Sequence, residues 1–569
     1  MLILEAGMSE ERREITKAMR KSLAVGQKMR KNTVTHKGGR HALTTTLLKC
    51  PSGCRSTSTY CNVCNTRYYP NYWVSNSEDT RTYYVDSESF NFIHVADHVF
   101  IETRTLHLFT TMMLNAWTSA SNCAQIYNDG VALRSLAPKL PITFSKTLIM
   151  DTNDVWDGLM LYWLLEDAQE RGEVLVTLHK SSSQSKRVQP AVRARNLRMA
   201  GTGQEHWNHI CDVCCYVDVD SDGNPDYIRS CVTDGVTIGR PTCSVQDCPN
   251  ALKSTKNRYC PNHKKEDLLC VVTTCKNMAD SGHRTCSLKD HRQIENYNAE
   301  HNKAMFQLKH RLAKLKTSLA AASLPTTSCD SNALVDEEEE LEVVIDQDGR
   351  LECDGKPDKG NKALKARFGR RRTHNEELCV ASCGVILGRC TFYGSEAPNG
   401  VRTFWKKLFP YKRSLPRILW HDNNCRIMAM LKKKGDEDNY FDSCALPVDV
   451  FHFKSKHKET DEDCNRHCNP AQWEILETPD KKWRFNSSIA EQTNAWIGGY
   501  QAIVREMEAD RYEFFLDEMI KRRNQLLVAR LERQNKCPRE IPRSELLRPG
   551  TPPPLKKRSP DQMATLTGQ

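Results

Sequence analysis

CSVQDCPNALKSTKNRYCPNHKKEDLLCVVTTCKNMADSGHRTCSLKDH, the stretch from Cys243 to His291, is rich in Cys and His and repeats one pattern almost back to back. Zinc prefers four tetrahedral thiolate and imidazole ligands, and each repeat supplies three Cys and one His. A doubled pattern at near-equal spacing argues against the alternative of unrelated core thiols and surface histidines. The stretch therefore predicts two structural zinc sites, and interleaved pairing would use the same ligands. The repeats are Cys243-x4-Cys248-x11-Cys260-x2-His263 and Cys270-x4-Cys275-x10-Cys286-x4-His291.

Three further groups of Cys and His have spacings that suit metal ligation. The first, near the N-terminus, offers four sulfurs. The second, Cys211-x2-Cys214 with Cys215 and Cys231 nearby, leaves a metal site and ordinary buried thiols equally open. The third mixes two His with two Cys, and a polar surface helix with stray ligands is its alternative. The first and third groups are Cys50-x3-Cys54-x6-Cys61-x2-Cys64 and His452-x4-His457-x6-Cys464-x3-Cys468.

The length and composition of the chain limit the kinds of protein that it can be. The chain has 569 residues, of which 39% are hydrophobic and 27% charged, so we expect a globular protein of several domains. Its start, MLILEAGMSEERRE, lacks the features of a signal peptide, and no run of about 18 apolar residues predicts a membrane span. Without a secretion signal, 25 Cys favour zinc over disulfides, in an intracellular and nuclear protein. The net charge of +11 modestly favours an anionic partner, although a solvated basic surface is equally common.

Three carboxylates have the layout of an RNase H-like nuclease. Asp234 precedes Gly235 in an apolar, β-rich run, Asp422 ends a strand-like run, and Glu491 opens a long helical pattern. Each has an ordinary alternative: a hairpin turn for Asp234, a helix N-cap for Asp422, and a capping box with Ser488 for Glu491. In an RNase H-like nuclease, such carboxylates converge to hold two divalent ions for phosphodiester chemistry. Magnesium suits carboxylate and water ligands, so we expect catalytic Mg²⁺ beside structural Zn²⁺.

Several of these segments resemble the KDZ (Kyakuja–Dileera–Zisupton) transposases, found largely in fungal genomes, and the cysteine clusters associated with them. KCPSGC…YCNVCNTRYYPNYWV is similar to one such cluster, and VTDGVTIGRPTCSVQDCPN…GHRTCSLKDHRQIE to another. LPRILWHDNNCRI, PVDVFHFKSKHKETDEDCNRHCNP and FNSSIAEQTNAWIGGY resemble the transposase core. The resemblance implies an α+β multidomain protein with an RNase H-like DDE core. Its carboxylates would be Asp234, Asp422 and Glu491, and a zinc-cluster insertion would interrupt it.

The expected organisation follows from these segments. Met305, Leu308, Leu312, Leu315 and Leu319 form a short heptad seam, which either packs on its own domain or forms a homodimer through residues 292–319. The expected parts are a basic arm (1–40), an N-terminal cysteine cluster (41–130), a helical and basic connection (131–205), the first core strands (206–242), the zinc cluster (243–291), an amphipathic helix (292–322), a charged linker (323–375), the remaining core and helical C-terminal region (376–535) and a disordered basic, Pro-rich tail (536–569).

The function expected from the sequence is that of a KDZ transposase-like protein. It would bind DNA, both element ends and target, through its zinc clusters and basic segments, and would cut and rejoin strands with Mg²⁺. The alternatives are a catalytically inactive, domesticated transposase that binds DNA or chromatin through zinc, and a dimeric scaffold in which zinc is purely structural. Phosphate contacts would add salt-dependent affinity without sequence choice. The basic residues proposed for these contacts are Lys365, Arg367, Arg370, Arg371 and Arg372.

Overall fold

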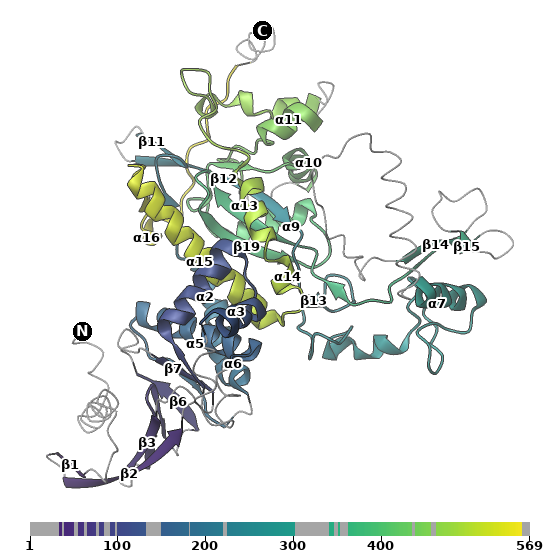
Figure 1. Ribbon diagram of the computed structural model, residues 1–569. Helices are drawn as coiled ribbons and strands as arrows, with labels where there is room; N and C mark the ends of the chain where they lie inside the picture. Colours follow the sequence, from purple (N-terminus) through teal and green to yellow (C-terminus); the bar gives the residue numbers. More distant parts are fainter. Residues whose placement is uncertain are drawn as a thin grey trace.

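The computed structural model gives a mixed α/β protein (Figure 1). Among the helices that the structure describes, none is both long enough and apolar enough to cross a membrane. The structure describes residues 33–36, 39–49, 55–61, 65–75, 79–84, 92–96, 99–131, 149–180, 183–219, 225–301, 341–345, 351–352, 362–434, 439–456 and 462–559.

The N-terminal part is a seven-stranded antiparallel sheet in the order β1-β2-β3-β4-β5-β6-β9, with a β7–β8 hairpin and helices beside it. Helix α5 begins at a capping box in which Asp151 and Asp154 bond each other's backbone N–H groups. The strands are β1 (Thr33–His36), β2 (Gly39–Lys49), β3 (Arg55–Cys61), β4 (Thr66–Tyr68), β5 (Tyr72–Ser75), β6 (Thr80–Tyr83), β7 (Phe92–Ala96), β8 (Val99–Glu102) and β9 (Val176–Leu178); the helices are α2 (Thr103–Ala116), α3 (Ala120–Ile126), η3 (Tyr127–Val131), α5 (Thr152–Glu170) and α6 (Gln184–Met199).

A second, five-stranded sheet is built around the long strand β12. β18 pairs antiparallel with the second half of β12, β19 continues antiparallel from β18, and β20 lies parallel to β12 over Ser230–Val232. β20 reads Ile-Leu-Trp and is buried throughout, as a strand covered on both faces requires. The strands are β11 (Cys215–Val219), β12 (Pro225–Val236), β18 (Asn375–Ala381), β19 (Ile386–Phe392) and β20 (Ile418–Trp420).

Helices cover both faces of this sheet. Helix α13 (Ile489–Gly498) packs on β12 and β18. Helix α9 (Pro398–Leu408) lies on the other face, where Trp405 donates a hydrogen bond to Thr233 Oγ1 of β12. Because side chains alternate along a strand, Thr233 and Gly235 face α9 and Asp234 faces α13.

The Cys/His-rich stretch is an insertion between β12 and β18. The chain leaves the sheet through β13 (Pro241–Thr242) and returns through β17 (Arg371–Arg372), which pairs with β13. Figure 1 shows α7 and β14 far from the N-terminal sheet, on the opposite side of the molecule. The other elements of the insertion are η7 (Pro261–Leu268), α7 (Lys289–His301), β14 (Leu341–Ile345), β15 (Leu351–Glu352) and β16 (Lys362–Ala366).

Part of the expected linker is folded onto this insertion. Residues 362–366 form β16, whose Ala366 bridges to Val272, and Lys365 O accepts a hydrogen bond from Thr273 N. The basic segment therefore forms backbone hydrogen bonds with the second Cys/His repeat. Helix α7 covers the start of the expected 292–322 helix, and Met305, Leu308, Leu312, Leu315 and Leu319 lie outside the described residues.

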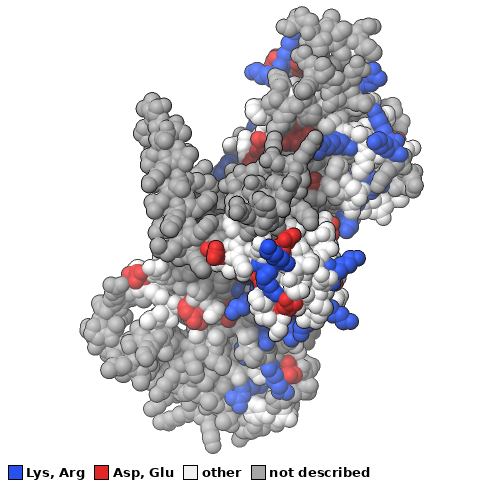
Figure 2. Space-filling model, turned by 90° about the vertical axis from the view of Figure 1, so that its right-hand side faces the viewer, with Lys and Arg blue, Asp and Glu red and all other residues white. Residues whose placement is uncertain are grey.

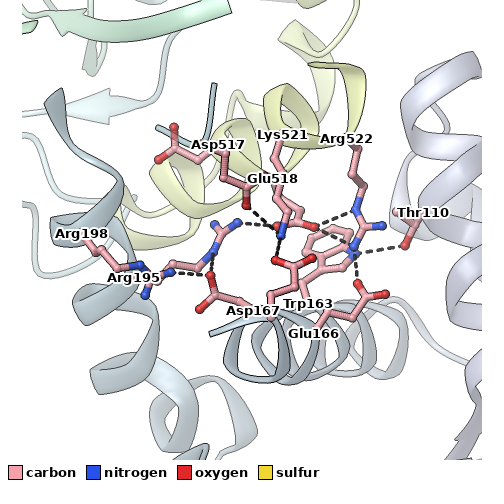
Figure 3. A network of polar contacts seen from close by, with 12 residues as sticks. Thr110, Trp163, Glu166, Asp167, Arg195, Arg198, Asp517, Glu518, Lys521 and Arg522 are labelled. Atoms are coloured by element: carbon pink, nitrogen blue, oxygen red, sulfur yellow. Dashed lines mark hydrogen bonds and ion pairs between the residues drawn. The ribbon is translucent and has the colours of Figure 1, made fainter. Parts of the chain in front are cut away.

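The C-terminal helix α15 (Ala509–Arg533) joins the two sheets. Buried Arg195 of α6 contacts Asp167 of α5 at 3.3 Å and Glu518 of α15 at 2.5 Å, and Arg522 pairs with Glu518 at 2.7 Å (Figure 3). Trp163 beside them donates a hydrogen bond to Thr110. The charges in this interface are therefore paired, as burial requires.

The expected C-terminal tail is also partly packed. Arg558 contacts Glu477 at 2.6 Å, and Lys557 lies over the ring of Trp473. The remaining elements are η6 (Gly201–Gly203), β10 (His209–Ile210), α10 (Asn424–Lys434), α11 (Val450–Lys456), α12 (Glu462–His467), η8 (Pro470–Gln472), η9 (Glu474–Leu476), α14 (Gln501–Val504), β21 (Arg539–Glu540) and α16 (Arg543–Leu546).

Candidate metal centres and carboxylate site

The two repeats of the insertion each bring four ligand atoms together. Tetrahedral zinc about 2.3 Å from sulfur and about 2.0–2.1 Å from nitrogen places its ligands about 3.6–3.8 Å apart. In the first unit, His263 Nδ1 lies 3.4–3.5 Å from three sulfurs, and Cys248 Sγ lies 3.9 Å from Cys260 Sγ. In the second, His291 Nδ1 lies 3.4 Å from Cys270 Sγ and 3.3 Å from Cys286 Sγ. Both sets could hold zinc, with Cys243 and Cys275 as the remaining ligands.

A third set of four ligands lies at the edge of the five-stranded sheet. His209, Cys211, Cys214 and Cys383 are all buried, and their ligand atoms lie within 4.8 Å of one another. Cys211 and Cys214 are 3.6 Å apart, and Cys383 lies 3.4 Å from His209 Nε2. This set could therefore also hold zinc, tying the turn before β11 to the turn between β18 and β19.

The ligands that complete this set differ from those expected near Cys211 and Cys214. Neither Cys215 nor Cys231 belongs to the set. Cys215 lies on β11, where its thiol contacts a backbone carbonyl, and Cys231 is buried on β12. His209 could have been found from its spacing to Cys211, but Cys383 could not, because only the sheet brings it close.

The N-terminal cysteine cluster is largely outside the described residues. That holds for Cys50, Cys54 and Cys64, while Cys61 ends strand β3 and its side chain is not described. Zinc binding by these four sulfurs stays a prediction.

The three predicted carboxylates come from three different elements that meet at one site. Asp234 lies within β12, Asp422 follows β20 by two residues, and Glu491 is in the first turn of α13. His452 Nδ1 lies 3.1 Å from Asp422 Oδ1 and 3.6 Å from Glu491 Oε1. Asn494, one helical turn after Glu491, donates a hydrogen bond of 2.8 Å to Asp234 Oδ2. The sheet and α13 together therefore gather these carboxylates.

Two of the ordinary alternatives for these residues do not hold. Asp234 is not in a hairpin turn, because it pairs with Leu378 inside the β12–β18 ladder. Ser488 does not form a capping box with Glu491, because its side chain makes no cap hydrogen bond and instead donates to Asp449 Oδ1 at 3.1 Å. Asp449 itself caps α11, accepting from the backbone N–H of Phe451.

The nearby carboxylates affect one another's protonation. Burial, followed by the charge of Asp422 and then those of Glu396 and Glu491, raises the pKa of Asp234 to about 7. Burial and Asp422 also raise the pKa of Glu396. Negative charges this close are stable together only when protons or cations neutralise them.

His452, expected as a zinc ligand together with His457, Cys464 and Cys468, lies beside the carboxylates. Its ring lies among the carboxylates, 3.4 Å from Asp449 as well as close to Asp422 and Glu491. Asp449 caps the helix that carries His452, so the cap fixes the ring beside the carboxylates. Cys464 and Cys468 pack instead against Cys425 of α10, and His457 lies outside the described residues.

The basic residues expected to contact phosphates are partly engaged within the protein. Glu506 pairs with Arg370 at 2.8 Å and with Arg372 at 2.7 Å. Arg367 and Arg371 are half-buried, and Lys365 is exposed. On the face shown in Figure 2, Lys and Arg lie among Asp and Glu, with no continuous basic surface over the described residues.

The architecture thus defines a mixed α/β protein with Cys/His clusters that could bind zinc and a separate carboxylate cluster. Residues 16–131 match a family described as CxC5 like cysteine cluster associated with KDZ transposases. Residues 232–297 match one described as CxC6 like cysteine cluster associated with KDZ transposases. These matches confirm the resemblance to KDZ-associated proteins and indicate a transposase-related protein. No curated protein and no solved structure matches the chain.

Proposed function

We propose that this chain is a KDZ transposase-like protein that binds DNA and cuts its strands at Asp234, Asp422 and Glu491. The observation that carries the proposal is the convergence of these three carboxylates from β12, the end of β20 and α13. Two Cys/His units of a type associated with KDZ transposases are inserted in the chain between β12 and β18.

The topology supports an RNase H-like core for this activity. Strands β12, β18 and β19 are antiparallel neighbours, and β20 returns parallel to β12 after helix α9. The first carboxylate is on the central strand and the second follows the parallel strand next to it. That is the order expected for a DDE nuclease, with the zinc units inserted between β12 and β18.

The donor set fits divalent cations, and Mg²⁺ is the one we propose. Asp234, Asp422 and Glu491 would hold the ions, Asn494 would orient Asp234, and Asp449 would fix His452 beside Asp422 and Glu491. Bound Mg²⁺ would activate water or a 3′-hydroxyl and stabilise the leaving oxygen. Burial and the neighbouring negative charges raise the pKa of Asp234. A cation bound there would also offset the repulsion among the carboxylates.

The zinc units and basic segments would supply DNA affinity, with DNA in the nucleus as the substrate. Dimerisation through residues 292–319 is a separate part of the proposal. Sedimentation of the full chain and of a chain lacking residues 302–319 tests it. The full chain is expected to sediment as a dimer and the shortened chain as a monomer, and the same number of chains per particle in both would contradict dimerisation through this segment.

Strand cleavage tests the proposed activity. Zinc-loaded protein is incubated with supercoiled plasmid and Mg²⁺, and nicked circles are counted for wild type, Asp422→Asn and Asp480→Asn. Asp480 is an exposed carboxylate in a surface turn and serves as the matched control. We expect Asp422→Asn to lose about 10²-fold or more of the activity and Asp480→Asn to lose none. If the wild-type protein binds plasmid in a salt-dependent way but does not nick it, the proposed cleavage activity is wrong and the chain is a non-catalytic DNA-binding protein.

A further inference from the structure

We propose that Glu377, Glu396 and His421 bind a divalent transition-metal ion on the α9 side of the five-stranded sheet. This site is distinct from the Asp234–Asp422–Glu491 cluster on the α13 side, and its existence does not depend on DNA cleavage. The three residues come from β18, the loop before α9, and the residue after β20.

Their ligand atoms are already gathered. One donor atom from each of the three side chains lies within 4.8 Å of the others. His421 Nε2 is 3.7 Å from Glu396 Oε1, close to the separation of about 3.5 Å for two ligands on one tetrahedral ion. Asn375 Nδ2 lies 3.3 Å from a carboxylate oxygen of each Glu and holds the two together.

Strand alternation separates this group from Asp234. Gly235 pairs with Glu377 across the β12–β18 ladder, whereas Asp234 pairs with Leu378. A Cβ on Gly235 would come within 2.8 Å of Glu377 Oε2 and 3.0 Å of Glu396 Oε2. Gly235 therefore leaves room for the two carboxylates on the α9 face, while Asp234 points toward α13.

The neighbouring Glu376 shows what a buried carboxylate on this strand ordinarily needs. Glu376 and Glu377 are both 0% exposed. Glu376 is neutralised by Arg389 at 3.1 Å and accepts hydrogen bonds from Thr391 and Tyr512. Within the described part of the chain, neither Glu377 nor Glu396 forms an ion pair with Lys or Arg. Two carboxylates in such a place must be neutralised either by bound protons or by a cation.

Unpartnered atoms around the group point to the same missing ligand. Glu377 Oε1, Asn375 Oδ1 and His421 Nδ1 are buried and accept or donate no hydrogen bond within the described part of the chain. His421 is 2% exposed, and its other ring nitrogen, Nε2, faces Glu396. An imidazole beside two carboxylates is a metal-binding donor set.

The donor types select the kind of ion. Carboxylates suit Mg²⁺, Ca²⁺ and Mn²⁺, whereas imidazole suits first-row transition metals such as Zn²⁺. A site with two carboxylates and one imidazole therefore favours Mn²⁺ or Zn²⁺ over Mg²⁺. The bound ion would tie the first half of β18 to the residue directly before Asp422, and so would stiffen the second carboxylate of the cleavage site.

Mn²⁺ titration followed by electron paramagnetic resonance tests this site in full-length protein that keeps zinc at its Cys/His sets and has been treated with a weak chelator to remove zinc from this carboxylate-rich site. The background variant Asp422→Asn/Glu491→Gln removes Mn²⁺ binding at the cleavage site. We expect it to keep one tight Mn²⁺, and adding Glu377→Gln/Glu396→Gln to weaken that binding at least tenfold. Glu474→Gln, at an exposed carboxylate, is the matched control. Equal Mn²⁺ binding with and without Glu377→Gln/Glu396→Gln would overturn the proposal.

A measurement on wild-type protein avoids any folding defect of the variants. Crystals equilibrated with Mn²⁺ are expected to give an anomalous difference peak between Glu377, Glu396 and His421. A map with no peak there at saturating Mn²⁺ would overturn the site. Because neither experiment measures DNA cleavage, an inactive protein that binds Mn²⁺ here would refute the proposed function and leave this inference standing.

Discussion

The two Cys/His units that could hold zinc and the carboxylate cluster are built in opposite ways. In the first Cys/His unit, Cys243 and His263 are 20 positions apart, and short loops bring the ligand atoms together. In the carboxylate cluster, Asp234 is held by Asn494, which is 260 positions away. A Cys/His unit can therefore form from its own segment, whereas the carboxylates meet only when the sheet and α13 are both in place. The third Cys/His set lies between these extremes, because three of its ligands are local and Cys383 is not.

The largest expected effect is loss of the local zinc units. Structural zinc contributes about 10–16 kcal/mol of apparent binding free energy in zinc-finger peptides. Cys260→Ser and Cys286→Ser should each remove one zinc and open residues 243–291 to proteases, while the five-stranded sheet stays folded. Zinc content and limited proteolysis measure this, with Cys537→Ser, an exposed thiol, as the control. Unchanged zinc content in both variants would contradict the local sites.

Cys383→Ser should act differently, because Cys383 joins a local Cys pair to the turn between β18 and β19. Losing this ligand should destabilise the whole sheet by more than about 4 kcal/mol, as removal of a metal centre does. Denaturant unfolding measures the change. If Cys383→Ser opened only the segment around Cys211 and left global unfolding unchanged, the third site would be local after all.

Cation binding by the carboxylate cluster should be sensitive to pH. The pKa of Asp234 is raised to about 7, so below that pH the folded protein carries a proton there that a cation must displace. Divalent-cation affinity should therefore fall as pH drops below about 7, by up to about tenfold per pH unit. Mn²⁺ titrations from about pH 6 to about pH 8 in a Glu377→Gln/Glu396→Gln background, which removes the second proposed Mn²⁺ site, measure the slope. Asp234→Asn in that background should flatten it, and a flat profile with Asp234 present would contradict the assignment.

The smallest expected effect concerns the basic segment that returns from the insertion. Arg370 is paired with Glu506, and such partly exposed pairs contribute about 0–1 kcal/mol. Arg370→Gln should leave DNA affinity and its salt dependence almost unchanged. Lys365→Gln, at an exposed position, should lower the salt slope by about 0.9 if Lys365 contacts a phosphate. A larger effect of Arg370→Gln would show that the Glu506 pair opens on DNA.

The sequence predicts the features that lie close together in the chain and predicts those that depend on topology only in part. The spacing from Cys243 to His291 groups eight ligands into two units, because the chain between them is short. Asp234, Asp422 and Glu491 can be proposed only from their order along the chain and from the family resemblance. Spacing pairs His452 with Cys464, yet the cap at Asp449 holds its ring beside the carboxylates. Glu377, Glu396 and Cys383 carry no local signal, because only the folded sheet and its loops bring them next to their partners.

The central claim is that Asp234, Asp422 and Glu491 act as one cleavage site. Single-turnover nicking of plasmid by zinc-loaded protein, with Mg²⁺, tests it through Asp234→Asn, Asp422→Asn, Glu491→Gln and the three double variants. Groups that act as a unit give non-additive losses. We predict that each single variant loses about 10²-fold or more and that the doubles lose no more than the worst single. Losses that multiply in the doubles, or a wild type that does not nick DNA, would contradict the claim.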